Sequence, residues 1–431
     1  MHRIKRAEIF FVFLLFTLKT FGNPAASAET ISRAEAIRYA VENSENAQLA
    51  RERANQLRAA GKQTSAFAKP QADIIGNYLE LKTNAPEIPI RELAFPERDI
   101  SSQVELRQLL YSGGRIWRSL ELEKNIYRQA KQAERFGLRE VVLGVKLAFD
   151  TVLFQKTRVD VLQDRTLQRQ TELEDASDLH EVGMVTSLDV RQAKLRLNFA
   201  KDALEAGKAD YLESLIDFNV VLGKSAESER LIPQGRLEDI PEIFPVIRKL
   251  HRVFSEGEVI DIEMQKTEAE AARLNYRIRR GEYFPEIQFV STAGTQGEST
   301  NELDESWSIG LQFFWKIFDG GLIRSKVDEA AAELRSASEN LERTRNEVSG
   351  QVEKITVDFQ ALQHRAELQN EAVILSRENY EDARGQYRAG TITLTRLGEF
   401  NLSYAEARFR LIEVYFLQRQ LLARAEALLE Q

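Results

Sequence analysis

The chain has 431 residues, no cysteine, and 67 acidic against 59 basic side chains, a formal net charge of −8. The lack of cysteine excludes disulfides, thiolate metal sites and a lipid-anchored N-terminal cysteine. An acidic surface argues against nucleic acid as a partner. No nucleophile–base arrangement or glycine-rich phosphate loop is visible, so we do not expect an enzyme. We also expect no metal or other cofactor, because the four histidines are scattered (His2, His180, His251 and His364).

The first residues read as an export signal peptide, which we place at residues 1–28. Basic residues open it, Ile9–Leu18 is an unbroken apolar run, and Ala26-Ser27-Ala28 supplies a small-x-small cleavage site. A run of about ten apolar residues is too short to span a bilayer. Residues 1–28 contain four basic residues and one acidic residue, so 55 basic and 66 acidic side chains follow, a net charge of −11. That remainder has no run of 18 apolar residues, and we predict no transmembrane helix in it.

A set of landmarks that occurs twice predicts that the chain is a duplication. Gly113-Gly114 and Gly183 bracket one long helical stretch, and Gly320-Gly321 and Gly390 bracket another at an offset of 207 residues. A proline, Pro70 or Pro285, separates a helical run from an alternating run in each copy. We therefore expect a first structural repeat at 29–229, a linker at 230–245 and a second repeat at 246–431.

Each repeat reads as helix, strand, strand, long helix, helix. Ser32 and Glu35 have the spacing of a capping box, which opens the first helix. In the first repeat we expect a helix to about Ala68, strands at 71–83 and 99–111, and helices at 114–182 and 187–223. In the second we expect a helix from about Val246 to Arg280, strands at 285–296 and 306–317, and helices at 321–388 and 393–429. Segments 83–98 and 295–306 are polar and rich in turn residues, which predicts exposed loops.

The alternation is clearest in the last strand. Its apolar residues alternate with small or polar ones, and a tryptophan stands at each end of the apolar set: Trp307, Ile309, Leu311, Phe313 and Trp315. A soluble sandwich would show the same alternation. The two tryptophans, however, are separated by about 26 Å at ~3.3 Å per residue, close to the height of the apolar band of an outer-membrane barrel. We expect the five residues to face lipid, and Ser308, Gly310 and Gln312 to face a lumen.

The long helices require partners of similar length. Steps of four and three residues from Val327 to Val373 meet polar residues only at Ser338, Arg345 and Gln369, the pattern of coiled-coil packing. A helix over 114–182 would be about 100 Å long. Four strands per chain cannot close a barrel, and open strand edges cannot face lipid. We therefore expect a mainly α fold with transmembrane β that forms an oligomer, and three chains would give twelve strands.

Short motifs in this order resemble the TolC-like outer membrane efflux protein family over essentially the whole chain after the signal. They comprise the opening ISRAEAI with AVEN, KPQ before the first strand, YSGG after the second, and the two turns VGMVTSLDV and RAGTITLTRL, at residues 31–37, 40–43, 69–71, 111–114, 182–190 and 388–397. The resemblance implies a homotrimer in which a long coiled-coil helical barrel continues a shared twelve-stranded outer-membrane β-barrel. It also implies the function of an outer-membrane exit duct, extending into the periplasm, for efflux of small molecules or secretion of proteins. Its implied partners are two further copies, a periplasmic adaptor, an inner-membrane pump and outer-membrane lipid.

The resemblance also implies two kinds of site. The hairpin turns would contact the adaptor through Gly183, Met184, Thr186, Gly390, Thr391 and Thr393. Asp189, Arg396 and Glu399 would line the pore aperture at its periplasmic end. The family is usually acidic at the position of Arg396, which here could pair with Asp189 or Glu399 or neutralise a ring of carboxylates. Asp189 could equally be a first-turn residue favoured by the helix dipole.

Two other classes of protein remain as alternatives. A periplasmic adaptor of the same kind of system would also have a signal and a helical hairpin, but normally one hairpin with β-rich domains on both sides. A secreted enzyme with helical insertions would need an active site, and none is visible in the sequence.

Overall fold

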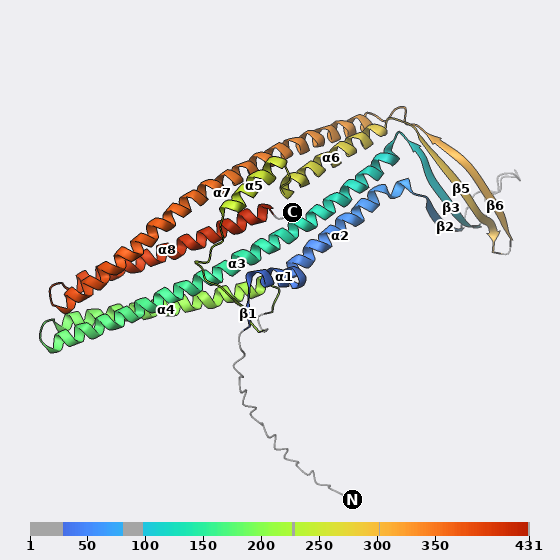
Figure 1. Cartoon of the computed structure of the whole chain (residues 1–431). Coiled ribbons are helices and arrows are strands. Elements are labelled where there is room, and N and C mark those ends of the chain that lie inside the picture. Colours follow the sequence, from blue (N-terminus) through green and yellow to red (C-terminus); the bar gives the residue numbers. More distant parts are fainter. Residues whose placement is uncertain (1–28, 81–97, 226–228, 301, 430–431) are drawn as a thin grey trace, which may run out of the picture.

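The computed structural model describes residues 29–80, 98–225, 229–300 and 302–429, so the predicted signal peptide and the segment 81–97 lie outside the described residues. A four-stranded sheet lies at one end of an elongated body of helices, and two hairpin tips lie together at the other end (Figure 1). None of the helices in these ranges combines the length and the hydrophobicity needed to cross a membrane. The elements are β1 (Thr30–Ile31), α1 (Arg33–Asn43), α2 (Glu45–Ser65), η1 (Ala66–Ala68), β2 (Gln71–Glu80), β3 (Arg98–Ser112), α3 (Arg115–Glu181), α4 (Ser187–Val221), β4 (Ile232–Pro233), α5 (Phe244–Glu256), α6 (Ile260–Gly281), β5 (Glu286–Ser299), β6 (Glu302–Phe314), α7 (Leu322–Arg388) and α8 (Leu394–Leu429).

The long helix α3 lies in the middle of the helical layer, with other helices packed on both of its sides. On the sheet side of the molecule α3 packs between α2 and α6, and on the tip side it packs between α4 and α8. The other long helix, α7, packs against α5, α6 and α8. The order across the layer is therefore α2, α3, α6, α7 near the sheet and α4, α3, α8, α7 near the tips, as Figure 1 shows.

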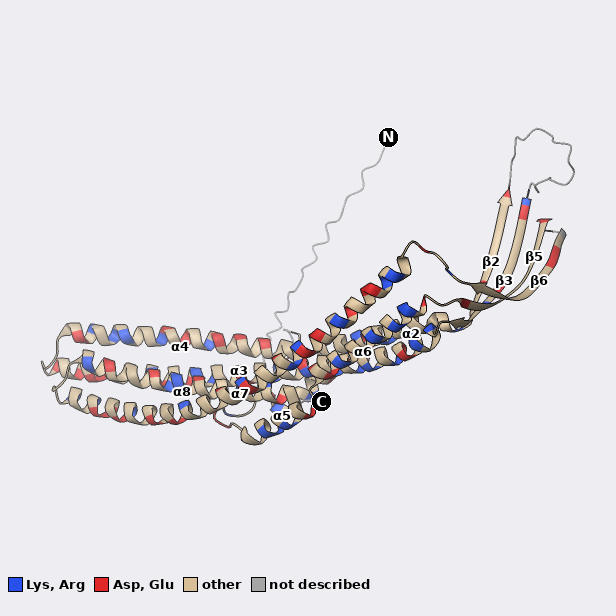
Figure 2. Ribbon diagram, turned by 90° about the horizontal axis from the view of Figure 1, so that it is seen from above, with Lys and Arg blue, Asp and Glu red and all other residues tan. Residues whose placement is uncertain are grey.

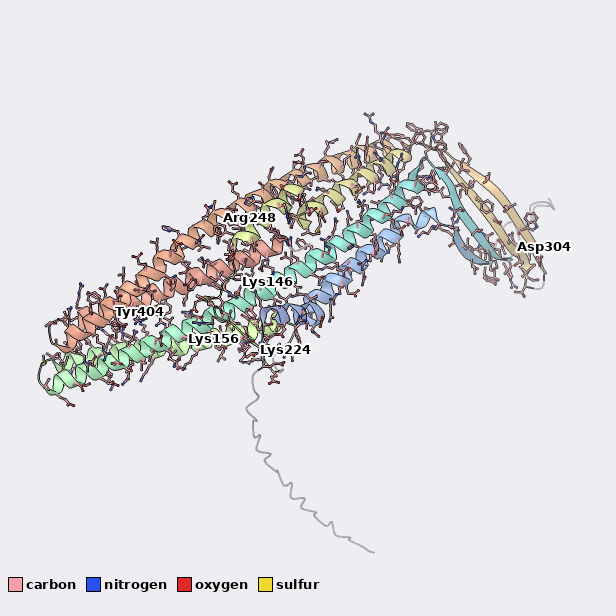
Figure 3. The ribbon with its side chains drawn as sticks, viewed as in Figure 1. Lys146, Lys156, Lys224, Arg248, Asp304 and Tyr404 are labelled. Carbon is pink, nitrogen blue, oxygen red and sulfur yellow. The ribbon has the colours of Figure 1, made fainter. Side chains whose placement is uncertain are left out.

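The two halves of the chain meet at mid-length, where buried charges join distant segments. Asp150 of α3 is fully buried and accepts hydrogen bonds from Arg419 Nε of α8 at 2.7 Å and from Arg33 Nη2 of α1 at 3.3 Å. Nearby, Lys146 Nζ lies 3.1 Å from Glu426 Oε2, and Figure 3 places Lys146 between the sheet and the tips. A buried carboxylate is stable only when it is paired, so this cluster fixes α1 and α8 against α3.

The sheet is antiparallel throughout, with the strand order β2-β3-β5-β6. The inner pair β3 and β5 comes from different repeats, whereas β2 and β6 form the two edges. A register shift between Leu109 and Tyr111 in β3 marks a bulge. Because a bulge adds one residue to one strand, the alternation of faces restarts after it, and Tyr111 lies opposite Ile287.

The first helix of each repeat is interrupted, which corrects two predicted continuous helices. Ser44 has an extended backbone and its side chain accepts from Ala47 N–H, so it ends α1 and caps α2. At this break the backbone of Ser44 lies close to Gly223, where an added Cβ would lie 2.8 Å from Ser44 Cα. In the second repeat Gly257, with φ 70°, separates α5 from α6.

Two strand predictions are also corrected. The segment 295–306, expected to be an exposed loop, is mostly strand, because β5 continues to Ser299 and β6 begins at Glu302. The last strand, expected to reach residue 317, ends at Phe314. Phe314 pairs with Glu286, the first residue of β5, and Pro285 before it has no N–H to continue the ladder.

The heptad seam of α7 is confirmed in its middle part, where Val348, Val352, Ile355, Phe359 and Leu362 are buried. Toward the sheet the buried positions instead follow Ile323, Ala330 and Ala337. The predicted seam there lies one position away, because the contact with α6 replaces the contact with α8.

Candidate functional site: the two-faced sheet and the hairpin tips

The register of the sheet gathers apolar side chains on one face across all four strands. Ile74 lies opposite Val104, which lies opposite Ala293, which lies opposite Trp307. Residues directly opposite each other in a sheet share a face. The same face carries Tyr78, Ile100, Leu106, Phe289, Ile287, Ile309, Leu311 and Phe313. Most of these side chains are exposed in the single chain, Ile74 by 81% and Trp307 by 79%. A contiguous apolar surface of this kind needs an apolar environment.

The opposite face of the sheet is polar. Asp73, Glu105, Thr292 and Ser308 form one row across the strands. Arg107 Nη2 lies 2.5 Å from Asp73 Oδ2, and the hydroxyls of Thr292 and Ser308 are 2.7 Å apart. Charged residues on the strands gather mainly at their two ends (Figure 2), and Figure 3 labels Asp304 at the far end. A sheet with one apolar and one polar face can separate lipid from water.

The five residues expected to face lipid divide into two groups. Trp307, Ile309, Leu311 and Phe313 share the apolar face of β6. Trp315 lies beyond the end of β6, and its indole N–H donates to the carbonyl of Tyr283 at 3.1 Å. The strand alternation therefore does not extend to Trp315. Sequence reasoning also missed Ile74 and Tyr78, because the alternation in β2 is weak, although both belong to the same apolar face.

Both hairpins turn through a left-handed glycine, as the sequence predicts. Gly183 has φ 75° and Gly390 has φ 73°. The following residue in each hairpin donates its N–H back into the last helical turn, Met184 to Leu179 O at 2.8 Å and Thr391 to Gln386 O at 3.0 Å. These bonds satisfy carbonyls that a helix end leaves open.

The two tips touch each other and present polar caps. A Cβ placed on Gly390 would lie 2.6 Å from Met184 Cε, so the turns are in contact. Thr186 caps α4, and the Thr393 hydroxyl accepts from Arg396 N–H at 3.3 Å at the start of α8. The six residues expected at the tips thus form one end surface, with Met184 as its exposed apolar side chain.

The three residues expected at the aperture are already engaged within the chain. Asp189 completes a capping box, accepting from Thr186 N–H at 2.9 Å and from Thr186 Oγ1 at 2.7 Å. These bonds hold the pKa of Asp189 below its usual value. Arg396 Nη1 lies 2.6 Å from Glu399 Oε2, and its guanidinium carbon lies 4.9 Å from the centre of the Phe400 ring. Of the alternatives for Arg396, the structure shows pairing with Glu399.

A second polar cluster behind the tips was not visible in the sequence. The buried carboxylate of Asp175 in α3 pairs with Arg384 at 2.9 Å and with Arg388 at 3.2 Å, both from α7. Arg169 Nη1 lies 2.6 Å from Glu172 Oε2, and burial raises the pKa of Glu172. Charged residues on helices usually form a solvated face, so their spacing gave no signal of these contacts. The cluster joins the first hairpin to the second.

The sheet, with one apolar face, one polar face and two open edges, continues into two helical hairpins whose long helices have 67 residues each. The chain shares its fold with VceC of Vibrio cholerae, with a TM-score of 0.79 at 15% identity, over 92% of this chain and 95% of that one. The channel CmeC of Campylobacter jejuni gives a TM-score of 0.77 at 15% identity, over 92% and 85%.

Sequence comparison agrees with the fold. Residues 259–430 match the family described as outer membrane efflux protein. The outer membrane protein TolC of Escherichia coli is 21% identical over 313 residues, which is 68% of this chain and 62% of TolC. The probable efflux pump outer membrane protein TtgC of Pseudomonas putida is 21% identical over 68% of this chain and 60% of its own length. The matched region thus spans less than two thirds of these relatives. The second half of the chain is therefore similar to the outer membrane efflux protein family, and the whole chain shares the fold of solved outer-membrane channels.

Proposed function

We propose that this protein is an outer-membrane exit duct for efflux or secretion. The observation that supports this function best is the division of the sheet into an apolar and a polar face, joined directly to hairpins that extend far from it. An apolar face suits lipid and a polar face suits a water-filled lumen. The names of the relatives, which describe outer membrane and efflux pump proteins, support the same function.

The duct is a homotrimer. One chain supplies four strands with two open edges, β2 and β6, and unpaired strand edges are unstable in lipid. Three chains supply twelve strands, enough for a barrel with a lumen. In this assembly the helices extend from the outer membrane into the periplasm.

The hairpin tips are the docking point for a periplasmic adaptor, which links the duct to an inner-membrane pump. The two turns meet at the end of the molecule farthest from the sheet (Figure 1). Their exposed Met184 and their threonine caps offer apolar and hydrogen-bonding contacts. In the trimer, Asp189, Arg396 and Glu399 line the aperture. Arg396 pairs with Glu399 in each chain and offsets its charge. We therefore expect the aperture of the trimer to be less negative than a ring of three aspartates and three unpaired glutamates.

The test of the function combines fractionation with electrical recording. The protein should remain with outer membranes after a high-salt wash, and the purified protein should give stepwise conductance in planar bilayers. The double variant Asp189→Asn with Glu399→Gln should weaken block of that current by divalent cations. Release by salt together with a lack of conductance would refute the duct. Unchanged divalent block would refute only the assignment of the aperture.

A further inference from the structure

The two long helices occupy unequal environments although they are equivalent parts of a repeat. The helix α3 has neighbours on both sides, α2 and α4 from its own repeat and α6 and α8 from the other. The helix α7 has α6 and α8 from its own repeat, with α5. In the described part of the chain no helix of the other repeat packs along the length of α7, although Arg384 and Arg388 near its tip end pair with Asp175 of α3. Its exposed side carries Val357, Leu368 and Ile374.

The internal repeat defines which surface would complete the environment of α7. Gln71 pairs with Arg107 in the first repeat, and Glu286 pairs with Phe314 in the second. Gln71 thus corresponds to Glu286, an offset of 215 residues that holds through the first strand of each repeat. Arg107 corresponds to Phe314, an offset of 207 residues that holds from the second strand onward. The offset of 207 also relates Gly183 to Gly390, the two left-handed tip glycines. Every contact between α3 and the second repeat can therefore be transposed to a contact between α7 and the first repeat.

We propose that a second copy of this chain docks its β2, α2 and α4 edge against the β6 and α7 edge in the register of the internal repeat. The inference rests on the proposed trimer and adds its register and its residue pairs. The occupant must be another copy, because α4 and α7 of one chain have α3 and α8 between them, a separation of about 25 Å at ~8–10 Å per helix.

This register first predicts which residues of β6 and β2 lie opposite each other between two copies. Within the chain, Val104 of β3 lies opposite Ala293 of β5. The offsets convert this pair into Leu311 of β6 opposite Tyr78 of β2 in the neighbouring copy. Leu311 and Tyr78 both belong to the apolar face, so the transposed register continues that face across the junction. A shift by one residue would place polar side chains against it, which is an independent check on the register.

The same register also predicts an ion pair between α4 of one copy and α7 of another. Within the chain, Arg408 Nη2 of α8 lies 2.8 Å from Asp164 Oδ2 of α3. The offset of 207 converts this pair into Lys201 of α4 and Glu371 of α7. Charge complementarity is preserved, with a base on the outer helix and an acid on the long helix. Both side chains are exposed, and neither makes an ion pair within the described ranges. Their pairing between copies would repeat the contact inside one copy.

The test uses the fact that the chain contains no cysteine. The double variant Tyr78→Cys with Leu311→Cys places two thiols directly opposite each other, with Cβ atoms about 5 Å apart. The two positions lie on the outer strands of a four-stranded sheet. Within one chain they are separated by about 14 Å across the strands and, because their rows cross β3 at Ile100 and Gln108, by about 26 Å along them, so a disulfide must join two copies. Ile74→Cys with Leu311→Cys is the matched control. It keeps the face but moves one thiol four residues, or about 13 Å.

Oxidation of the first variant in outer membranes should give linked dimers and closed covalent rings on a denaturing gel, and the control pair should give little product. Preferential linking of the control pair in a protein that is trimeric by mass would overturn the register and leave the duct intact. A monomeric protein that is washed from the membrane would overturn the proposed function as well.

A second experiment tests the same register without cysteine variants. Lys201→Glu and Glu371→Lys should each lower the temperature at which the oligomer dissociates in detergent, and the double reversal should restore it. Lys208→Glu, one heptad along α4, is the matched control and should not be rescued by Glu371→Lys. Lack of rescue in the double reversal would overturn the pair.

Discussion

Replacing Asp150 by asparagine tests whether the mid-length ion cluster fixes the two repeats together. The side chain of Asp150 is fully buried and that of Arg419 is 7% exposed. The substitution preserves shape but removes the charge that faces Arg419 Nε at 2.7 Å and Arg33 Nη2 at 3.3 Å. Arg419 retains the carbonyls of Arg236 and Asp239 as acceptors, at 3.3 and 2.8 Å, together with the neutral side-chain oxygen of the new asparagine.

The expected cost is large because a buried charge loses its partner. Removing one member of a buried pair typically costs about 3–5 kcal/mol. Asparagine still offers one oxygen to Arg419, so we expect about 3 kcal/mol, which increases local opening roughly 100-fold at 1.4 kcal/mol per factor of ten. The conformational change is opening of α1 and the C-terminal part of α8 from α3.

Hydrogen–deuterium exchange of the trimer in detergent measures this opening directly, since amide protection reports local opening free energy. Amides of α1 and of α8 near Arg419 should lose about two orders of magnitude of protection. Asp210→Asn is the matched control. Asp210 pairs with Arg158 at 2.6 Å, but the two side chains are 42% and 39% exposed, and such pairs contribute only about 0–1 kcal/mol. Equal exchange in the two variants would refute the reasoning.

Three further substitutions test the sheet and the tips. Leu311→Arg should destabilise the membrane-inserted protein by about 2–4 kcal/mol if Leu311 lies near the bilayer midplane, whereas Gln312→Arg on the polar face should cost far less. Folding titrations into lipid vesicles measure both free energies of unfolding. A larger loss for Gln312→Arg than for Leu311→Arg would contradict the assignment of the two faces of the sheet. Gly390→Val should impair export but leave the trimer assembled, because a β-branched residue is strained at φ 73°; normal efflux would count against docking at this tip. Thr186→Ala should cost about 1 kcal/mol at neutral pH through loss of the cap. The hydrogen bonds from Thr186 lower the pKa of Asp189, so the stability that the charged carboxylate contributes is present above the ordinary carboxyl pKa and is lost as the pH falls through the lowered one. The difference in thermal unfolding between the two proteins should therefore shrink in strong acid, and a difference that acid leaves unchanged would contradict the capping box.

The sequence by itself determined the features that depend on neighbouring residues. The alternation from Trp307 to Phe313 specified which side chains share a face, because successive residues of a strand point to opposite sides. The turns at Gly183 and Gly390 and the capping box of Ser32 and Glu35 followed from local turn and helix-end chemistry. These features need no distant partner, and their patterns were sufficient to predict the long helices and the four strands.

Only the tertiary structure decided the features that depend on contacts between distant residues. The ends of β6 are set by its partner β5, so Trp315 left the strand despite continuing its pattern. The close approach between Ser44 and Gly223 joins segments that are far apart in the sequence. Asp150 meets its arginines across 117 and 269 residues of sequence. A charged residue on a helix has the same local pattern whether water or a buried partner faces it, because the pairing is fixed by how whole helices pack.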